Sequence, residues 1–152
     1  MIILTILVLL LDFFSKYIVS KLMIVNDSIS IVNNFFNITY VKNTGAAFSI
    51  FSNNTILVIV ISIFIIGLLI FYIYKNRSYN KLENVSYALI LGGAIGNLID
   101  RLVYGYVIDF LDFKILSYDA PIFNLADTFI VIGVILFLVN TLRSRYDGNS
   151  SK

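Results

Sequence analysis

The chain has 152 residues, about the length of one domain, and its composition is that of an integral membrane protein. Apolar residues make up 59% and charged residues 13%, whereas soluble domains hold about 45–50% and about 25%. The mean hydropathy is +0.92. A net charge of +2 creates no field that would attract nucleic acid. With no cysteine and no histidine, the chain has no disulfide, no Ser-His-Asp triad and no Cys or His zinc ligand.

Four apolar stretches are long enough to cross a bilayer, for which a helix needs about 20 residues. They cover about residues 1–25, 55–74, 85–103 and 122–142. The last is expected to begin at Pro121, because proline suits the first turn of a helix. Residues 1–11 could pass for the apolar core of a signal peptide, but no basic residue precedes them and no cleavage site follows before residue 26. We therefore expect a retained first helix.

Lysine and arginine are concentrated on one side of this arrangement. The loop between the second and third stretches reads KNRSYNK, and the tail adds Arg143, Arg145 and Lys152. The other two loops hold Lys42 and Lys114. Because basic loops stay in the cytoplasm, both termini are expected inside and the other two loops outside.

The two outer segments, 26–54 and 104–121, differ in character. In the first, Ile29 and Ile31 alternate with serines, which predicts short surface strands. The second carries Asp109 together with Asp112 and Asp119, and the latter two are interpreted as solvated loop charges. Residues 143–152 are expected to form a disordered tail. The predicted fold is thus a single all-α membrane domain, 1–152, with four transmembrane helices and a small extracytoplasmic β-sheet.

The candidate functional residues inside the predicted helices all fall toward the outer side. They are Asp12, Lys16, Asn97, Asp100, Arg101, Asn124 and Asp127. Asn140 is the exception in the otherwise apolar inner halves of the second and fourth stretches. An ionisable residue in a bilayer costs about 2.5–3.5 kcal/mol and marks a functional site or a paired charge. Glycines at 92, 93 and 96 would let a neighbouring helix approach the third helix closely, so the polar groups can be held between helices.

Several of these residues also have a purely structural interpretation. Asp12 and Lys16, spaced i and i+4, can be a neutralised pair that lets the first helix insert. Arg101 can simply reach the interface beside Asp100. Asn43 begins an ordinary turn sequence, Asn-Thr-Gly-Ala. Asp127 differs, because it enters an apolar helix with no cation within four residues, which favours a function.

Two carboxylates sharing one proton are the most credible hydrolytic device for this set of residues. Held close together they cannot both ionise easily, so one serves as base toward a water while the other serves as acid. Asp109 precedes the fourth helix and Asp127 enters it, so the two are the plausible pair. They predict cleavage of a peptide bond without a metal.

Two other functions stay open. A small ion-coupled carrier could use Asp12, Lys16 and Asp127 as a relay, but it would need polar residues through both halves of the bilayer. A Ser-Lys protease could use Ser15 or Ser49, although neither has an evident matched base.

Five motifs in order resemble the bacterial lipoprotein signal peptidases, or signal peptidase II. They are DFFSK from Asp12, KNTGAAF from Lys42, GGAIGNLIDR from Gly92, VIDFLD from Val107 and FNLAD from Phe123. The resemblance covers nearly the whole chain. Phe13 stands where the family often has a polar residue.

The resemblance implies a membrane aspartic protease with Asp109 and Asp127 as its catalytic pair. It implies orienting or substrate-binding roles for Asp12, Lys16, Asn43, Gly45, Asn97, Arg101 and Asn124. The implied substrate is a prolipoprotein cut just before a cysteine that carries diacylglycerol. The implied setting is the bacterial cytoplasmic membrane, with the site at the outer leaflet, no cofactor or metal, no nucleic acid, contact with membrane lipid, a monomeric enzyme and globomycin-type inhibitors.

Overall fold

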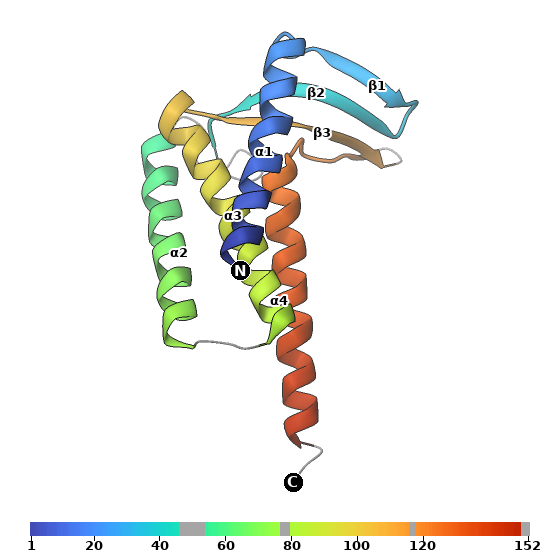
Figure 1. The fold of residues 1–152 in the computed structure, drawn as a ribbon. Coiled ribbons are helices and arrows are strands. Elements are labelled where there is room, and N and C mark those ends of the chain that lie inside the picture. Colours follow the sequence, from blue (N-terminus) through green and yellow to red (C-terminus); the bar gives the residue numbers. More distant parts are fainter. Residues whose placement is uncertain (46–53, 77–79, 116–117, 150–152) are drawn as a thin grey trace.

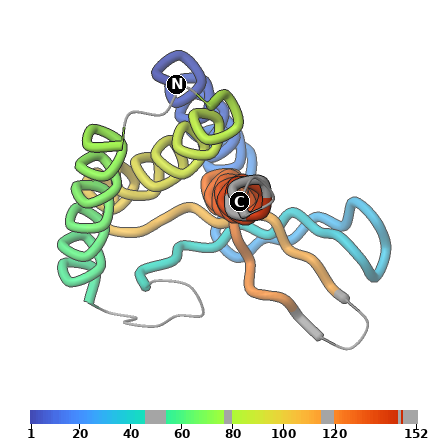
Figure 2. Tube along the Cα trace, turned by 90° about the horizontal axis from the view of Figure 1, so that it is seen from below, coloured from blue at the N-terminus to red at the C-terminus, as the bar shows by residue number. Residues whose placement is uncertain are grey.

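The structure is a computed structural model that describes residues 1–45, 54–76, 80–115 and 118–149. Its elements in chain order are α1 (Ile2–Leu22), β1 (Ser28–Val32), β2 (Phe36–Asn43), α2 (Thr55–Lys75), α3 (Lys81–Tyr104), β3 (Val107–Ile115), β4 (Tyr118–Asp119) and α4 (Leu125–Asn149). The helices run side by side, and the sheet lies across one end of them and projects beyond α4 (Figure 1). Seen from below, α2 and the β1–β2 hairpin lie on opposite sides of α4 (Figure 2).

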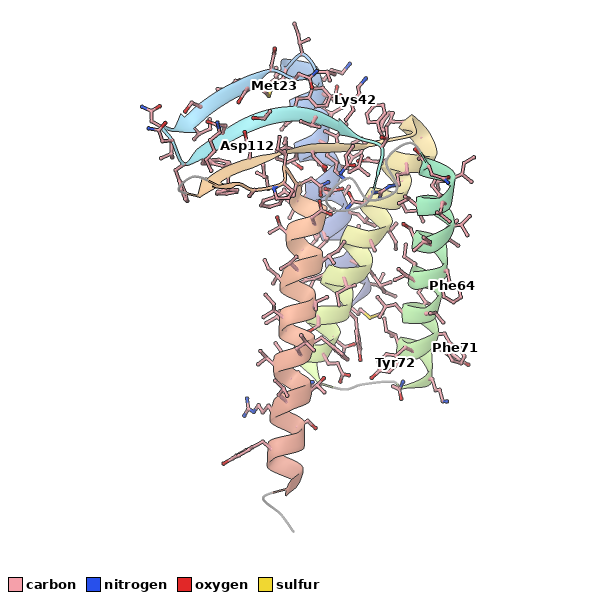
Figure 3. The ribbon with its side chains drawn as sticks, turned by 180° about the vertical axis from the view of Figure 1, so that it is seen from behind. Met23, Lys42, Phe64, Phe71, Tyr72 and Asp112 are labelled. Carbon is pink, nitrogen blue, oxygen red and sulfur yellow. The ribbon has the colours of Figure 1, made fainter. Side chains whose placement is uncertain are left out.

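Within the described residues, four helices are long and apolar enough to cross a membrane, which confirms the predicted fold class. Most of their large apolar side chains are exposed, as expected for surfaces that face lipid. Phe64 and Phe71 point away from the bundle (Figure 3). Tyr72 points toward α3, and its ring lies 6.1 Å from that of Tyr87. One face of α2 therefore packs on the bundle and the others are left for lipid.

The ends of two helices differ from the prediction for local reasons. Helix α3 begins at Lys81, because the side chain of Asn80 caps it by accepting from the N–H of Leu82 at 2.9 Å. Helix α4 begins at Leu125 rather than at Pro121, because Phe123 still pairs with Leu111 as a β-bridge. The predicted disordered tail from residue 143 is wrong as far as residue 149, since α4 continues to that point. Residues 150–152 lie outside the described residues.

Helix α3 packs closely on its neighbours through glycine, as the sequence predicts. A Cβ on Gly92 would lie 2.6 Å from Cγ1 of Val8 in α1. A Cβ on Gly93 would meet the backbone oxygen of Ala126 in α4, and one on Gly96 would lie 2.5 Å from Oδ2 of Asp12. These three positions bring α1 and α4 against the same part of α3.

The antiparallel sheet has the order β1-β2-β3-β4, with β4 a two-residue strand at one edge. Strands β1 and β2 confirm the prediction for segment 26–54. Strands β3 and β4 were not predicted. Ile108 and Phe110 of β3 join Val19 of α1 and Tyr40 of β2 in a buried cluster. This cluster fixes the sheet to the C-terminal end of α1, and Asp109 lies in the chain between its two β3 members.

Candidate active site

Asp109 is buried on β3, opposite Val41 of β2, and only 2% of it is exposed. Its Oδ2 accepts a hydrogen bond from Nδ2 of Asn43 at 2.8 Å, and its Oδ1 accepts one from Nδ2 of Asn124 at 2.7 Å. Burial raises the pKa of Asp109 from 3.8 to about 6, and the charge of Asp127 adds to this rise. The bond from Asn43 acts in the opposite direction and lowers the pKa.

Asp127 lies in the first turn of α4 and faces the same polar groups. Its Oδ1 accepts from Nδ2 of Asn97 at 2.8 Å, and its Oδ2 lies 3.4 Å from the backbone N–H of Asn124. Asn124 therefore donates to both acids, with its side chain to Asp109 and with its backbone to Asp127. All four carboxylate oxygens accept one hydrogen bond each.

The two acids line one cavity of about 840 Å³. Asn43, Gly45, Asn97 and Arg101 share this lining, and Ile130, Val131 and Ile132 extend it along α4 with apolar surface. The cavity thus joins a polar part, lined by both carboxylates, to an apolar flank on α4.

The turn after β2 and Arg101 both line the cavity and contact each other. Oδ1 of Asn43 accepts from the N–H of Gly45 at 2.9 Å, so Asn43 forms the predicted turn and also binds Asp109. Arg101 donates from Nη2 to the carbonyl of Gly45 at 2.9 Å and from Nη1 to the carbonyl of Asn97 at 3.2 Å. Arg101 therefore does more than reach toward the interface.

A buried ion cluster lies beside the two acids. Nζ of Lys16 is 2.7 Å from Oδ2 of Asp12, which confirms the predicted i, i+4 pair, and 2.9 Å from Oδ2 of Asp100. The same ammonium donates to Oδ1 of Asn97 at 2.9 Å. Oδ1 of Asp12 accepts from the backbone N–H of Ala126 at 3.0 Å, which ties α1 to the start of α4.

All nine site residues singled out from the sequence lie in this region, and three further acids need comment. Asp100 was not assigned to the site, although its spacing of three from Asn97 places both on one helix face. Asp112 was predicted to be a solvated loop charge, which is wrong. It is 9% exposed on β3 and accepts from Thr39 at 2.7 Å and Asn37 at 3.3 Å. Asp119 lies in β4.

The two rival functions find little support in the described residues. Apart from Ser86, the buried polar residues belong to the site or to the sheet at one end of the molecule, whereas a carrier needs a path through both halves. Oγ of Ser15 donates to the carbonyl of Asp12 in its own helix at 2.8 Å. Ser49 lies outside the described residues. Among the residues described, no three His, Cys, Asp or Glu side chains are grouped to hold a metal.

Comparison with known proteins gives one consistent result. The sequence profile of the family described as Signal peptidase (SPase) II matches residues 4–143. The chain belongs to the signal peptidase II family. A lipoprotein signal peptidase of Staphylococcus carnosus is 43% identical over 148 residues, which cover 97% of this chain and 91% of the relative. One from Caldanaerobacter subterraneus is 45% identical over 129 residues, covering 85% and 86%.

Two solved structures of bacterial membrane enzymes share the fold. A bacterial membrane enzyme determined at 2.3 Å resolution superposes with a TM-score of 0.89 at 38% identity, covering 96% of this chain and 89% of the other. A second, at 1.9 Å resolution, gives 0.83 at 39% identity, covering 93% and 91%. The chain is thus a multi-pass bacterial membrane peptidase of the signal peptidase II family.

Proposed function

We propose that this protein is an aspartic endopeptidase that removes the signal peptide from diacylglyceryl-modified prolipoproteins by cutting before the lipidated cysteine. The observation that carries the proposal is the joint hydrogen bonding of Asp109 and Asp127 by Asn124, within one cavity. The curated relatives named above are lipoprotein signal peptidases.

The proposed chemistry needs only the two acids and a water. One acid is ionised and the other protonated, because two neighbouring carboxylates cannot both ionise easily. The carboxylate takes a proton from the water while the water oxygen attacks the peptide carbonyl carbon. The protonated acid donates its proton to the leaving nitrogen as the C–N bond breaks. The proton taken from water remains on the pair, which regains its starting charge with the two acids exchanged.

The remaining site residues are proposed to bind or orient. Asn43, Asn97 and Asn124 hold the carboxylates through the bonds described above. Arg101 and Gly45 border the cavity, where a planar, permanently charged guanidinium suits peptide carbonyl oxygens. Lys16 donates to Asn97 and Asp12 accepts from the backbone of Ala126, and both are proposed to hold the other site residues in place.

The form of the cavity suits a lipid-modified peptide. Its polar end offers hydrogen bonds to a backbone, and Ile130, Val131 and Ile132 on α4 offer apolar surface to acyl chains or to a signal helix. We place the site at the outer leaflet of the cytoplasmic membrane, with both termini in the cytoplasm and membrane lipid around the helices. A single chain holds the whole set of side chains, so we propose a monomer that needs no metal or organic cofactor and binds globomycin-type inhibitors.

The direct test replaces either acid by its amide. Asp109→Asn and Asp127→Asn should each lower processing of a lipidated precursor by about 1,000-fold or more, because the pair loses its base or its proton donor. Asp27→Asn changes an exposed acid in the turn before β1 and is the matched control. Processing is followed by the mobility shift of purified precursor in detergent, beside an unmodified precursor as substrate control.

Two further arms sharpen this test. EDTA should leave the rate unchanged and globomycin should abolish it. Full processing by well-folded Asp127→Asn protein would reject the aspartic mechanism, and strong inhibition by EDTA would point to a metal hydrolase instead. Equal cleavage of the unmodified precursor would reject the lipidated substrate.

A further inference from the structure

We propose that Lys16, which contacts neither Asp109 nor Asp127, is the positioning residue that fixes the direction of the amide hydrogen bonds reaching both. The inference rests on the function proposed above. Lys16 is 2% exposed, and its ammonium is within 3 Å of three acceptors, at 2.7 Å from Asp12, 2.9 Å from Asp100 and 2.9 Å from Oδ1 of Asn97.

The contact between Lys16 and Asn97 permits one orientation of the Asn97 amide. An ammonium only donates hydrogen bonds, so Asn97 must turn its oxygen toward it. Its Nδ2 group then donates to Oδ1 of Asp127 at 2.8 Å. With the amide flipped, its NH₂ would face the ammonium and its oxygen would face the carboxylate of Asp127, so both contacts would become repulsive.

This orientation is passed on to Asn124. Oδ1 of Asn97 also accepts from Nδ2 of Asn124 at 3.1 Å, and the same Nδ2 donates to Oδ1 of Asp109 at 2.7 Å. The other atom of that amide, Oδ1 of Asn124, accepts from the backbone N–H of Asp127 at 3.0 Å. The NH₂ group of each amide therefore reaches one of the two acids, Asn97 donating to Asp127 and Asn124 to Asp109, in an arrangement that begins at Lys16.

A simpler role for Lys16 is to neutralise buried acids. The charged groups in and around the site are Asp12 and Lys16 on α1, Asp100 and Arg101 on α3, Asp109 on β3 and Asp127 on α4. Removing Lys16 alone would leave Asp12 and Asp100 buried without their shared cation, which can unfold a protein. A test must therefore separate the charge of Lys16 from its hydrogen bond to Asn97.

The first experiment compares Lys16→Met with the charge-matched pair Asp12→Asn/Lys16→Met. The pair removes one charge of each sign, so the cluster of Asp12, Lys16 and Asp100 keeps its net charge. The oxygen of the new amide can still accept from Ala126. We expect both proteins to lose kcat by about tenfold to a hundredfold, the effect of misplacing one charge-assisted hydrogen bond. KM should change little, since the described cavity lining includes Asn97 but not Lys16.

The second experiment asks whether Lys16 acts through Asn97. Asp12→Asn/Lys16→Met is measured with and without Asn97→Ala, and the losses are compared as a double-mutant cycle. If Lys16 works by orienting Asn97, the triple variant should be no slower than Asn97→Ala combined with Asp12→Asn. Losses that multiply would overturn the proposal.

The pH-rate profile of the charge-matched pair separates a positioning role of Lys16 from a counter-ion role. The charge of Lys16 lowers the pKa of Asp109, as does the bond from Asn124. Losing both effects should raise the pKa of Asp109 and move the acidic limb of the pH-rate profile of Lys16→Met to higher pH. In the charge-matched pair the limb should also lie at higher pH than in wild type. Recovery of wild-type kcat and of the wild-type limb in that pair would show that Lys16 is only a counter-ion.

Controls separate this inference from the proposed function. Lys21→Met changes an exposed lysine of the same helix and should behave as wild type. Thermal unfolding in detergent is recorded for every variant, so that lost activity is not mistaken for lost fold. If wild-type protein fails to process the lipidated precursor, the proposed function is wrong. If wild type is active and both Lys16 variants match it, only the role of Lys16 is wrong.

Discussion

Four N–H donors determine how Asp109 and Asp127 behave as acids. Nδ2 groups of Asn43, Asn97 and Asn124 and the backbone N–H of Asn124 each meet one carboxylate oxygen. Neutral amides stabilise an ionised carboxylate without adding a full opposite charge, so burial is only partly offset. The result at Asp109 is a pKa of about 6, where a proton can be gained and lost near neutral pH.

Asn43 provides a direct test of this balance. Its bond lowers the pKa of Asp109, so Asn43→Ala should raise that pKa above its value of about 6. A larger share of Asp109 then stays protonated at a given pH, and the acidic limb of the pH-rate profile should move to higher pH. The profile is measured on a lipidated precursor from pH 4 to 9.

The matched control for Asn43 is Asn37→Ala on the same strand. Asn37 donates to Asp112 rather than to Asp109, so the limb should not move. An unmoved limb in Asn43→Ala, or equal movement in both proteins, would contradict the assignment of that limb to Asp109.

At the residue scale, the environment of an acidic side chain is easier to infer from the sequence when no possible charge partner lies near it in the chain. Asp127 stands alone in an apolar helix, and that isolation alone indicated a function. Asp100 was not assigned to the site, and the cation that it contacts, Lys16, lies on another helix, so the sequence spacing does not indicate the contact. Asp112 could not be interpreted correctly, because Asn37 and Thr39, which bury and satisfy it, come from a different strand.

Among the elements, α3 is the helix on which both α1 and α4 pack to form the site. Its glycines admit α1 on one side and the first turn of α4 on another, at the level of Asn97. The closest of these approaches joins Gly93 to the backbone of Ala126, the residue before Asp127. Added volume there would push against the backbone next to Asp127, one of the two proposed catalytic acids.

Substitution of Gly93 should therefore affect both stability and activity. A Cβ at Gly93 meets the backbone oxygen of Ala126 and Cγ1 of Ile130, so Gly93→Ala should destabilise the protein by about 1–3 kcal/mol and lower its activity. Gly67→Ala on α2 is the control, since a Cβ there meets nothing within 4 Å. The stability of Gly67→Ala should match or slightly exceed that of wild type, because alanine favours a helix by about 1 kcal/mol over glycine, and its activity should be unchanged.

Thermal unfolding in detergent and precursor processing measure the two effects. Equal behaviour of the two alanine proteins would mean that the approach of α3 to α4 does not position Asp127. Loss of stability with full activity in Gly93→Ala would mean that the helices can separate without moving the site.

The elements were predictable where one periodicity dominates and failed where tertiary contacts decide. Length and hydropathy were enough for the four helices. Strand β3 was missed because both of its faces are buried between Val107 and Phe110, so it lacks the alternation that indicates a surface strand. The start of α4 was misplaced because pairing of Phe123 with Leu111 keeps the chain extended past Pro121.

For the whole molecule, the distribution of basic residues implies one orientation in the membrane. The sheet and the site share one end of the bundle, and the C-terminal ends of α2 and α4 and the N-terminal end of α3 lie toward the other (Figure 1). Lys75, Lys81 and Arg143 belong to that second end. Positive residues remain in the cytoplasm, so the sheet and the site should face outward.

Because the chain has no cysteine, single cysteines can report this orientation directly. Ser30→Cys on exposed β1 should react with a membrane-impermeant maleimide in intact cells. Ser144→Cys near the end of α4 should react only after the membrane is opened. Labelling of Ser144→Cys in intact cells, with Ser30→Cys protected, would reverse the assigned topology.

No single element carries both acids. Asp127 belongs to a helix long and apolar enough to span a membrane, whereas Asp109 belongs to a strand of the sheet at one end of the bundle, and Asn124 donates hydrogen bonds to both. On the proposed function, the scissile bond must be presented at that one height above the hydrocarbon. The enzyme would then select its cleavage site by the distance of the lipid-anchored residue from the membrane as much as by the amino-acid sequence around it.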